Sequence, residues 1–252
     1  MTKQEALFNY TLRLGDNALI LGHRLSEWSS KGPLLEEDIA MTNMALDLIG
    51  RADAMLKYAA QVEGKGRTED DLAYKRGERQ FLCNLIVQLP NGDFGYTIAR
   101  QLIMSAFDIC LYEELVKSKD ETIAAISAKA VKEVKYHLKF ATDWTLRLGD
   151  GTEESHQRIQ KSFNDIWMYT GELFEMNEVD AILIKEGIAV DLNSLKARWK
   201  KIMTEVLLEA TLTVPADAYM QTGSRKGVHT ESLGYILAEM QYLQRAYPDA
   251  KW

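Results

Sequence analysis

Long stretches without proline, in which apolar residues recur every three or four positions, most constrain how this chain can fold. Only four prolines occur in 252 residues, at positions 33, 90, 215 and 248, and they lie among other turn-forming residues. Two series, apolar except for Ser105, show the helical spacing clearly: Leu7, Tyr10, Leu14, Ala18, Leu21, Leu25 and Trp28, and Phe94, Ile98, Leu102, Ser105, Ile109 and Tyr112. Alternating strand patterns are hard to find, so the sequence predicts an all-α protein.

Four long helices are predicted, at about 3–28, 35–63, 93–118 and 120–149, with shorter helices over 69–88 and in the C-terminal hundred residues. The segment between the second and third long helices is too long for a tight turn and fits a crossover along a bundle. We therefore expect a ferritin-like four-helix bundle, two antiparallel hairpins joined by a long crossover, with additional C-terminal helices. A single domain over residues 1–252 is expected.

Charge and hydropathy exclude several classes of function. The net charge of −7 argues against broad nucleic-acid binding, which needs a dense cationic surface. No apolar stretch approaches the ~20 residues of a membrane span. Charges interrupt the first 25 residues from Lys3 onward, which suits a helix better than a secretory signal and predicts a cytoplasmic protein. Cys83 and Cys110 lie in apolar surroundings, where each is expected to be a buried small hydrophobe.

A small cationic cluster lies among glycines in the segment "GSRKGVH", with Arg225, Lys226 and His229. The simplest interpretation is a solvated loop. The alternative is a local site for an anionic ligand, such as a CoA ester.

The helix pattern raises the question of a metal site inside the bundle. A ferritin-like di-iron centre takes one carboxylate from each of two helices and a Glu-x-x-His pair from each of the other two. The acidic half of this pattern is nearly complete. Its members, one or two to a helix, are Asp16 or Glu27 on the first, Asp47 on the second, Asp108 on the third and Glu133 on the fourth.

The imidazole half of the pattern is missing. Gly50 follows Asp47 by three residues, and Tyr136 follows Glu133 by three, so neither expected histidine is present. His137 follows Glu133 by four and shares its helix face, so this pair could hold an ion or form hydrogen bonds with neighbouring groups. His23 lies on the first helix, the wrong element to supply the missing ligand. These positions therefore resemble vestiges of a metal site.

A literal Glu-x-x-His string begins at Glu153 and ends at His156, directly after "GDGT". This position favours the first turn of a helix, where Thr152 would cap the backbone and the acids would favour the positive end of the helix dipole. We interpret the string as a helix start.

Blocks along nearly the whole chain resemble the C-type (PaaC) subunits of bacterial phenylacetyl-CoA monooxygenases, also called 1,2-phenylacetyl-CoA epoxidases. They are "LGDNALILGHRLSEW", "EEDIAMTNMALDLIGRA", "LPNGDFGYTIARQ", "KEVKYHLKFATDWTLRLGDGTEESHQRIQ" and "HTESLGYILAEMQYLQRAYPDAKW". The resemblance implies a ferritin-like, non-catalytic subunit that has lost the iron ligands and supports a homologous, catalytic di-iron subunit. It also implies that this chain has no cofactor of its own, and that a complex with further small and reductase subunits uses O2 and NADPH.

The surface that would meet the catalytic partner is expected on the first three long helices, because "RQLIMSAFDICLYEEL" carries more apolar positions than one core face needs. A homodimer is a further expectation when the partner is absent. Two alternatives stay open at this point. One is a self-sufficient di-iron or single-metal oxygenase using Asp47, Asp108, Glu133 and His137, and the other is a module that binds a CoA ester through the Arg225 loop.

Overall fold

The computed structural model describes residues 1–248 and 250. These residues form α-helices and short 3-10 helices and include no strand, so the all-α prediction is confirmed. The chain divides into two compact units. Unit 1 comprises residues 1–90, 177–183 and the described residues from 223 onward, and unit 2 comprises residues 91–176 and 184–222.

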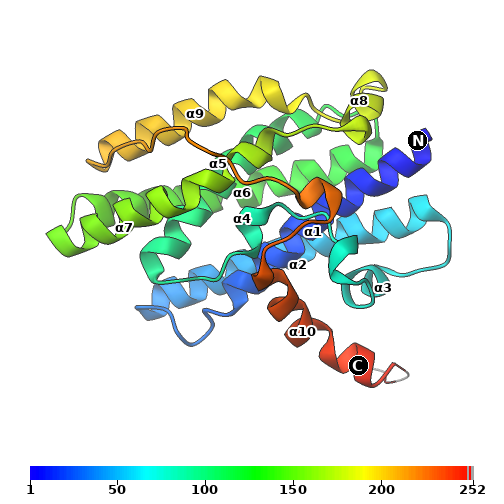
Figure 1. The fold of residues 1–252 in the computed structure, drawn as a ribbon, viewed down its shortest axis with the longest axis horizontal. Helices are drawn as coiled ribbons and strands as arrows, with labels where there is room; N and C mark the ends of the chain where they lie inside the picture. Colours follow the sequence, from blue (N-terminus) through cyan, green and yellow to red (C-terminus); the bar gives the residue numbers. More distant parts are fainter. Residues whose placement is uncertain (249, 251–252) are drawn as a thin grey trace. The chain divides into compact units, whose positions relative to one another are not determined.

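A long helical hairpin forms the base of unit 1. Helices α1 (Lys3–Ser26) and α2 (Leu35–Glu63) lie side by side in Figure 1. They approach closely because α1 has glycine at its contact face. A Cβ at Gly15 would lie 2.8 Å from Leu56 Cδ2, and one at Gly22 would lie 3.3 Å from the Ala45 carbonyl oxygen. The glycines therefore allow the two backbones to pack closely.

The ends of this hairpin follow from local chemistry. Thr2 and Glu5 form a capping box at the start of α1. Gly64 ends α2 in the left-handed conformation (φ 68°), which glycine adopts without a steric penalty. The prediction for α2 is confirmed at both ends. That for α1 is two residues too long, because the chain turns after Ser26, where the Trp28 N–H donates to the Leu25 carbonyl oxygen.

The other elements of unit 1 are short, apart from a last helix near the C-terminus. They are α3 (Glu69–Tyr74), η1 (Glu78–Gln80), α4 (Leu85–Gln88), most of α8 (Glu178–Lys185), η4 (Ser224–Lys226) and α10 (Glu231–Ala246). The prediction of shorter helices over 69–88 is confirmed, and these pieces are joined by extended backbone. Helix α10 packs against α3 and η1, so the last part of unit 1 covers the segment that follows α2.

Unit 2 contains the second predicted hairpin, α5 (Phe94–Leu115) and α6 (Glu121–Gly149). Its other elements are α7 (Glu153–Ile166), η2 (Trp167–Tyr169), η3 (Gly171–Phe174) and α9 (Leu192–Glu209). Helices α6, α7 and α9 all pack on α5 (Figure 1), and most α5 residues are buried. The expectation that α5 carries a spare apolar face for a partner is therefore wrong, because helices of its own unit use that surface.

Aromatic side chains fill part of the core of unit 2. The rings of Phe107 and Phe174 lie 5.7 Å apart, Phe174 and Trp199 5.4 Å apart, and Trp167 and Trp199 5.5 Å apart. Both indoles also satisfy their N–H groups: Trp199 donates to the Ile103 carbonyl oxygen at 3.2 Å and Trp167 to Asp217 at 3.1 Å. This agrees with the general preference of buried Trp for a polar partner.

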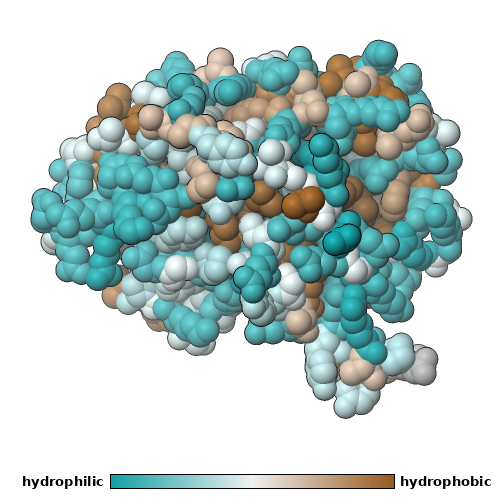
Figure 2. Space-filling model, in the orientation of Figure 1, coloured by the Kyte–Doolittle hydropathy of each residue, from teal (hydrophilic) through white to brown (hydrophobic). Residues whose placement is uncertain are grey.

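The surface in Figure 2 is mostly hydrophilic, with brown apolar patches between teal regions. Within the part of the chain that the structure describes, no helix has the length and apolar character needed to cross a membrane.

Candidate functional site

The candidate carboxylate of α1 is already engaged by the protein itself. Asp16 is fully buried, and both of its oxygens accept hydrogen bonds from the guanidinium of Arg76, one at 3.0 Å. The Leu82 N–H donates to the same carboxylate at 2.8 Å. Asp16 therefore has a bidentate cationic partner and a backbone donor inside unit 1.

The partner Arg76 comes from the segment between α3 and η1. It is nearly fully buried, donates to the Gln80 carbonyl oxygen at 2.8 Å, and lies 4.1 Å from the centroid of the Phe81 ring. This cation–π contact and the ion pair fix the side chain from two directions. The positive charge that a metal ion would bring to Asp16 is supplied here by a guanidinium.

A second buried ion pair lies one helical turn earlier on α1. Arg13 donates to both oxygens of Asp180 on α8, one at 3.1 Å, and the Asn177 N–H donates to Asp180 at 2.9 Å. Burial is the largest influence on the Asp180 carboxyl and opposes its ionisation. The bonds from Arg13 and Asn177 together outweigh burial, so that its pKa lies below the ordinary value of 3.8. Neither Arg76 nor the Arg13–Asp180 pair was a sequence candidate.

The other candidate ligands on the α1–α2 hairpin each lie in a different environment. Glu27 is the C-cap of α1 and pairs with Arg24 at 2.7 Å, so it lies at the helix end. His23 is half-buried, and burial lowers its pKa. Asp47 is half-buried on α2, while Gly50, where a histidine was expected, is exposed.

In unit 2 the candidates lie on the α5–α6 hairpin. Asp108 is half-buried on α5, and Glu133 on α6 lies 3.4 Å from Lys129. His137 is 1% exposed, with its ring 6.3 Å from that of Tyr136. Tyr136, the second position where a histidine was expected, is 48% exposed and so lies at the surface of α6.

The Glu-x-x-His string is a helix start, as predicted. The Thr152 hydroxyl accepts from the Ser155 N–H at 3.2 Å at the beginning of α7. His156 places Nδ1 2.7 Å from the Gly149 carbonyl oxygen, so its ring binds the last turn of α6. The string thus links two helix ends.

Part of the cationic loop with Arg225, Lys226 and His229 is packed against other residues of unit 1. His229 lies between the Gln88 side chain, at 2.9 Å, and the Phe81 carbonyl oxygen, at 3.0 Å. Arg225 is half-buried and lies close enough to Asp180 to lower the pKa of that carboxyl, whereas Lys226 is exposed. Of the three cationic candidates, Arg225 and His229 therefore contribute to the packing of unit 1.

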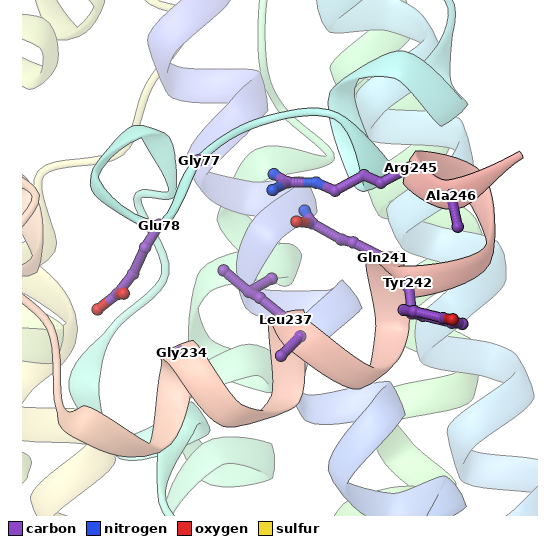
Figure 3. Close-up of a pocket in the computed structure, with 9 residues that line it drawn as sticks. Gly77, Glu78, Gly234, Leu237, Gln241, Tyr242, Arg245 and Ala246 are labelled. Carbon is purple, nitrogen blue, oxygen red and sulfur yellow. The ribbon is translucent and has the colours of Figure 1, made fainter. Parts of the chain in front are cut away.

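Unit 1 also contains a hollow of about 520 Å³ beside α10, shown in Figure 3. One wall is α10 and the other is the segment at Gly77 and Glu78. Two of the polar side chains in it have structural partners: Gln241 donates to the Ala73 and Arg76 carbonyl oxygens, and Arg245 donates to that of Arg76 at 2.8 Å. We interpret the hollow as a packing gap between α10 and the segment it covers.

The donor set does not fit a pair of iron ions. Asp16 is occupied by Arg76, Gly50 has no side chain to donate, and Tyr136 is at the surface. Among the described residues, no group of three or more His, Cys, Asp or Glu side chains is placed to hold a metal ion.

The whole chain, residues 1–252, matches the family described as phenylacetic acid catabolic protein, and the chain belongs to this family. Over 243 residues it is 50% identical to the C subunit of 1,2-phenylacetyl-CoA epoxidase from Escherichia coli (strain K12). That alignment covers 96% of this chain and 98% of the relative. The resemblance to the C-type subunits is therefore confirmed over nearly the full length, and the relative is named as one component of an enzyme.

Proposed function

We propose that this chain is the non-catalytic structural subunit of a multicomponent phenylacetyl-CoA 1,2-epoxidase. Its role would be to support a homologous, catalytic di-iron subunit in the aerobic breakdown of phenylacetate. The observation that carries the proposal is the Asp16–Arg76 pair, because the bundle acid of α1 is neutralised by the chain's own arginine. The 50% identity to the relative from Escherichia coli supports the same role.

The proposal includes the ferritin-like architecture. In it, the hairpins α1–α2 and α5–α6 form one bundle, and residues 1–252 fold as one domain with additional C-terminal helices. One antiparallel hairpin in each unit, with the long segment 64–93 between them, supports this topology. A cytoplasmic location is part of the proposal, and it agrees with two buried cysteines that are both free thiols.

The proposal assigns a different role to each component of the complex. The catalytic partner would hold the iron, a reductase would deliver electrons from NADPH, and O2 would supply the oxygen atom of the ring epoxide. This chain would provide a folded surface for the catalytic partner and neither metal nor cofactor. Glu133 and His137 would then be polar core residues of α6.

Co-expression tests the supporting role. The catalytic homologue is produced with and without this chain, and its soluble yield and its conversion of phenylacetyl-CoA to the epoxide are measured with the reductase present. We expect both to fall when this chain is omitted. A catalytic homologue that is soluble and fully active alone would refute the proposal.

Elemental analysis separates this proposal from a self-sufficient metal oxygenase. The purified chain, expressed with added iron, is compared with its His137→Gln and Glu133→Gln variants. We expect iron well below one atom per chain in all three proteins. Stoichiometric iron that is lost in the variants would instead favour the oxygenase.

A further inference from the structure

The outer face of α6 carries a row of lysines. Lys129, Lys132, Lys135 and Lys139 are all exposed, and exposed Tyr136 lies among them. At 3.6 residues per turn these five side chains fall within an arc of about 120° and span about 15 Å along the helix axis. The arc lies opposite the buried residues of α6, so the lysines point away from the core of unit 2. We refer to these five residues as the α6 lysine face.

Repulsion between these lysines is only partly relieved within the chain. The two outer lysines have acidic neighbours, because Lys129 lies 3.4 Å from Glu133 and Lys139 pairs with Asp143. The two middle lysines form no ion pair with any residue that the structure describes. Like charges three or four residues apart on a helix destabilise it. The α6 lysine face therefore has an energetic cost that this chain does not offset by itself.

Helix α7 in the same unit shows how exposed charges are otherwise arranged. Arg158 pairs with Glu154 at 2.6 Å, and Lys161 pairs with Asp165, so positive and negative side chains alternate along that helix. The whole chain has a net charge of −7, so its composition does not explain a surface of positive charge on α6. A helix face with unpaired charges of one sign is complementary to a partner surface of the opposite sign.

Acidic residues on both sides limit what the α6 lysine face can bind. Glu121 and Asp143 lie within the same arc of the helix, one before the lysines and one after them. A nucleic acid or an anionic membrane extends well beyond about 15 Å and would meet these carboxylates as well. A compact acidic patch on a protein would not. The exposed Tyr136 fits a protein partner too, since tyrosine is enriched at protein interfaces.

The composition of the α6 lysine face indicates a transient partner. Obligate interfaces are large and apolar, whereas electron-transfer encounters are among the smallest protein contacts. Of the α6 residues that the structure describes, Tyr136 is the one large apolar side chain that is exposed. Complementary charges mainly raise the rate of association, which suits a protein that binds and leaves repeatedly.

We propose that the α6 lysine face docks an acidic surface of the reductase. This inference rests on the proposed function, in which a reductase delivers electrons to the catalytic subunit. The reductase is the component whose task requires repeated encounters, and the lysines would attract and orient it. The face would therefore serve the reaction without any metal or cofactor in this chain.

The dependence of epoxidation on reductase concentration tests the docking. NADPH-driven epoxidation of phenylacetyl-CoA by the full complex is measured as the reductase concentration is raised. We expect the double variant Lys132→Glu with Lys135→Glu to raise the KM for the reductase at least about tenfold, with kcat at saturating reductase unchanged. The double variant Lys132→Arg with Lys135→Arg keeps the charge and should behave like the native chain.

The matched control places the same change of charge on another helix. Lys196 and Lys201 of α9 are both exposed, and the double variant Lys196→Glu with Lys201→Glu should change the KM for the reductase less than about twofold. Size exclusion checks that each variant still assembles with the other subunits, and circular dichroism checks that it is folded.

Ionic strength gives a second measurement. The KM of the native complex should rise between about 50 and about 300 mM salt, because salt screens exposed charges. The double variant Lys132→Glu with Lys135→Glu should lose most of this salt dependence. Binding of the reductase to the isolated full-length chain at low salt, followed by biolayer interferometry, should rank the native chain and its variants in the same order.

An unchanged KM in the α6 glutamate variant, in a complex whose activity still requires this chain, overturns the inference and leaves the supporting role standing. Equal effects of the α6 and α9 variants overturn it too, as does a short oligonucleotide that binds the isolated chain as tightly as the reductase does. Failure of the proposed function has a different sign, a catalytic homologue that is fully active alone. Direct binding of the reductase to the isolated chain would still decide the docking in that case.

Discussion

The buried pair of Asp16 and Arg76 illustrates how strongly one residue can depend on another. Removing two charges from water is costly, and the pair is stable only because geometry and additional hydrogen bonds compensate. Here the carboxylate has a bidentate guanidinium and the Leu82 N–H, while Arg76 also contacts Phe81. Loss of either partner would leave the other charge buried alone.

Replacing Arg76 therefore tests the pair. We expect Arg76→Ala to lower the free energy of unfolding by about 3–5 kcal/mol, since Asp16 would be left as an uncompensated buried charge. Urea denaturation followed by circular dichroism measures the change. The control is Lys139→Ala, which breaks an exposed pair with Asp143 and should cost under about 1 kcal/mol. Equal effects of the two substitutions would contradict the assignment.

Asp180 gives a prediction for pH dependence. Its folded-state pKa lies below 3.8, so the unfolded chain binds the proton more tightly than the folded chain. The contribution of ionised Asp180 to the free energy of unfolding is therefore fully present above about pH 4, and it is lost as the pH falls through the pKa of Asp180 in the folded protein. We expect the gap in unfolding free energy between the native protein and Asp180→Asn to be largest near neutral pH and to shrink in acid.

The measurement is urea denaturation of both proteins from neutral pH down to below the pKa of a free aspartate. The control is Asp143→Asn, which removes an exposed ion pair with Lys139 and should change the free energy of unfolding at neutral pH by less than about 1 kcal/mol. A gap for Asp180→Asn that stays constant into acid would mean that Asp180 does not titrate as the geometry implies.

At the scale of elements, the long helices were predictable because their ends carry local signals. Asp93 and Asp120 accept from backbone N–H groups at the starts of α5 and α6, and Gly64 closes α2. Both the regular spacing of apolar residues and these capping residues lie within a short stretch of sequence, so they can be recognised without the structure. The predicted starts of α5 and α6 are accordingly one residue from the observed ones.

Side-chain partners far apart in sequence were not predictable in the same way. Asp16 meets a residue 60 positions away, and Arg13 meets one 167 positions away. The spacing of apolar residues along one helix carries no information about contacts with distant parts of the chain. The sequence therefore suggested Asp16 as a possible metal ligand and did not indicate that it pairs with Arg76. The misjudged face of α5 has a related cause, because a periodic pattern does not reveal how many helices surround an element. The ligand-like roles of Asp47, Asp108, Glu133 and His137 stay predictions.

The junction between α6 and α9 offers a test at this scale. A Cβ at Gly149 would overlap the Ala210 carbonyl oxygen and lie 2.9 Å from the Ala210 Cβ, so Gly149→Ala should destabilise the protein by about 1–3 kcal/mol. The matched control is Gly50→Ala, where α2 has open space and helix propensity predicts a gain of about 1 kcal/mol.

Thermal unfolding of both alanine variants against their parents gives the comparison. Opposite signs are expected, because the substitution is chemically the same and only the space around the glycine differs. If Gly149→Ala were as stable as its parent, α6 and Ala210 would not be in the close contact described above.

For the whole molecule, the assembly of unit 1 from separate chain segments is the main feature. Residues after 223 contribute directly to the packing of the first ninety: Gln241 binds the Ala73 and Arg76 carbonyl oxygens, and Arg24 binds that of Ser232 at 3.1 Å. The segment around Arg76, which carries the partner of Asp16, is thus covered by α10.

Removing the chain from residue 223 onward should therefore loosen that segment. In hydrogen exchange measured by mass spectrometry, we expect the largest loss of protection over residues 68–90, because α10 and His229 no longer hold them. Helices α5 and α9, which pack together through Trp199 and Ile103, serve as the internal reference. Uniform loss of protection across the chain would contradict this expectation.

The order of the segments also has a consequence for protein synthesis. The last segment of unit 2 ends at Thr222, and the final piece of unit 1 follows it in the chain. During translation, the unit that starts first is therefore the last to be completed, because its α1 and α2 emerge from the ribosome well before α10 does. Until then, the surface of α3 and η1 that α10 covers stays exposed, and transiently exposed apolar surface makes a folding chain prone to aggregation.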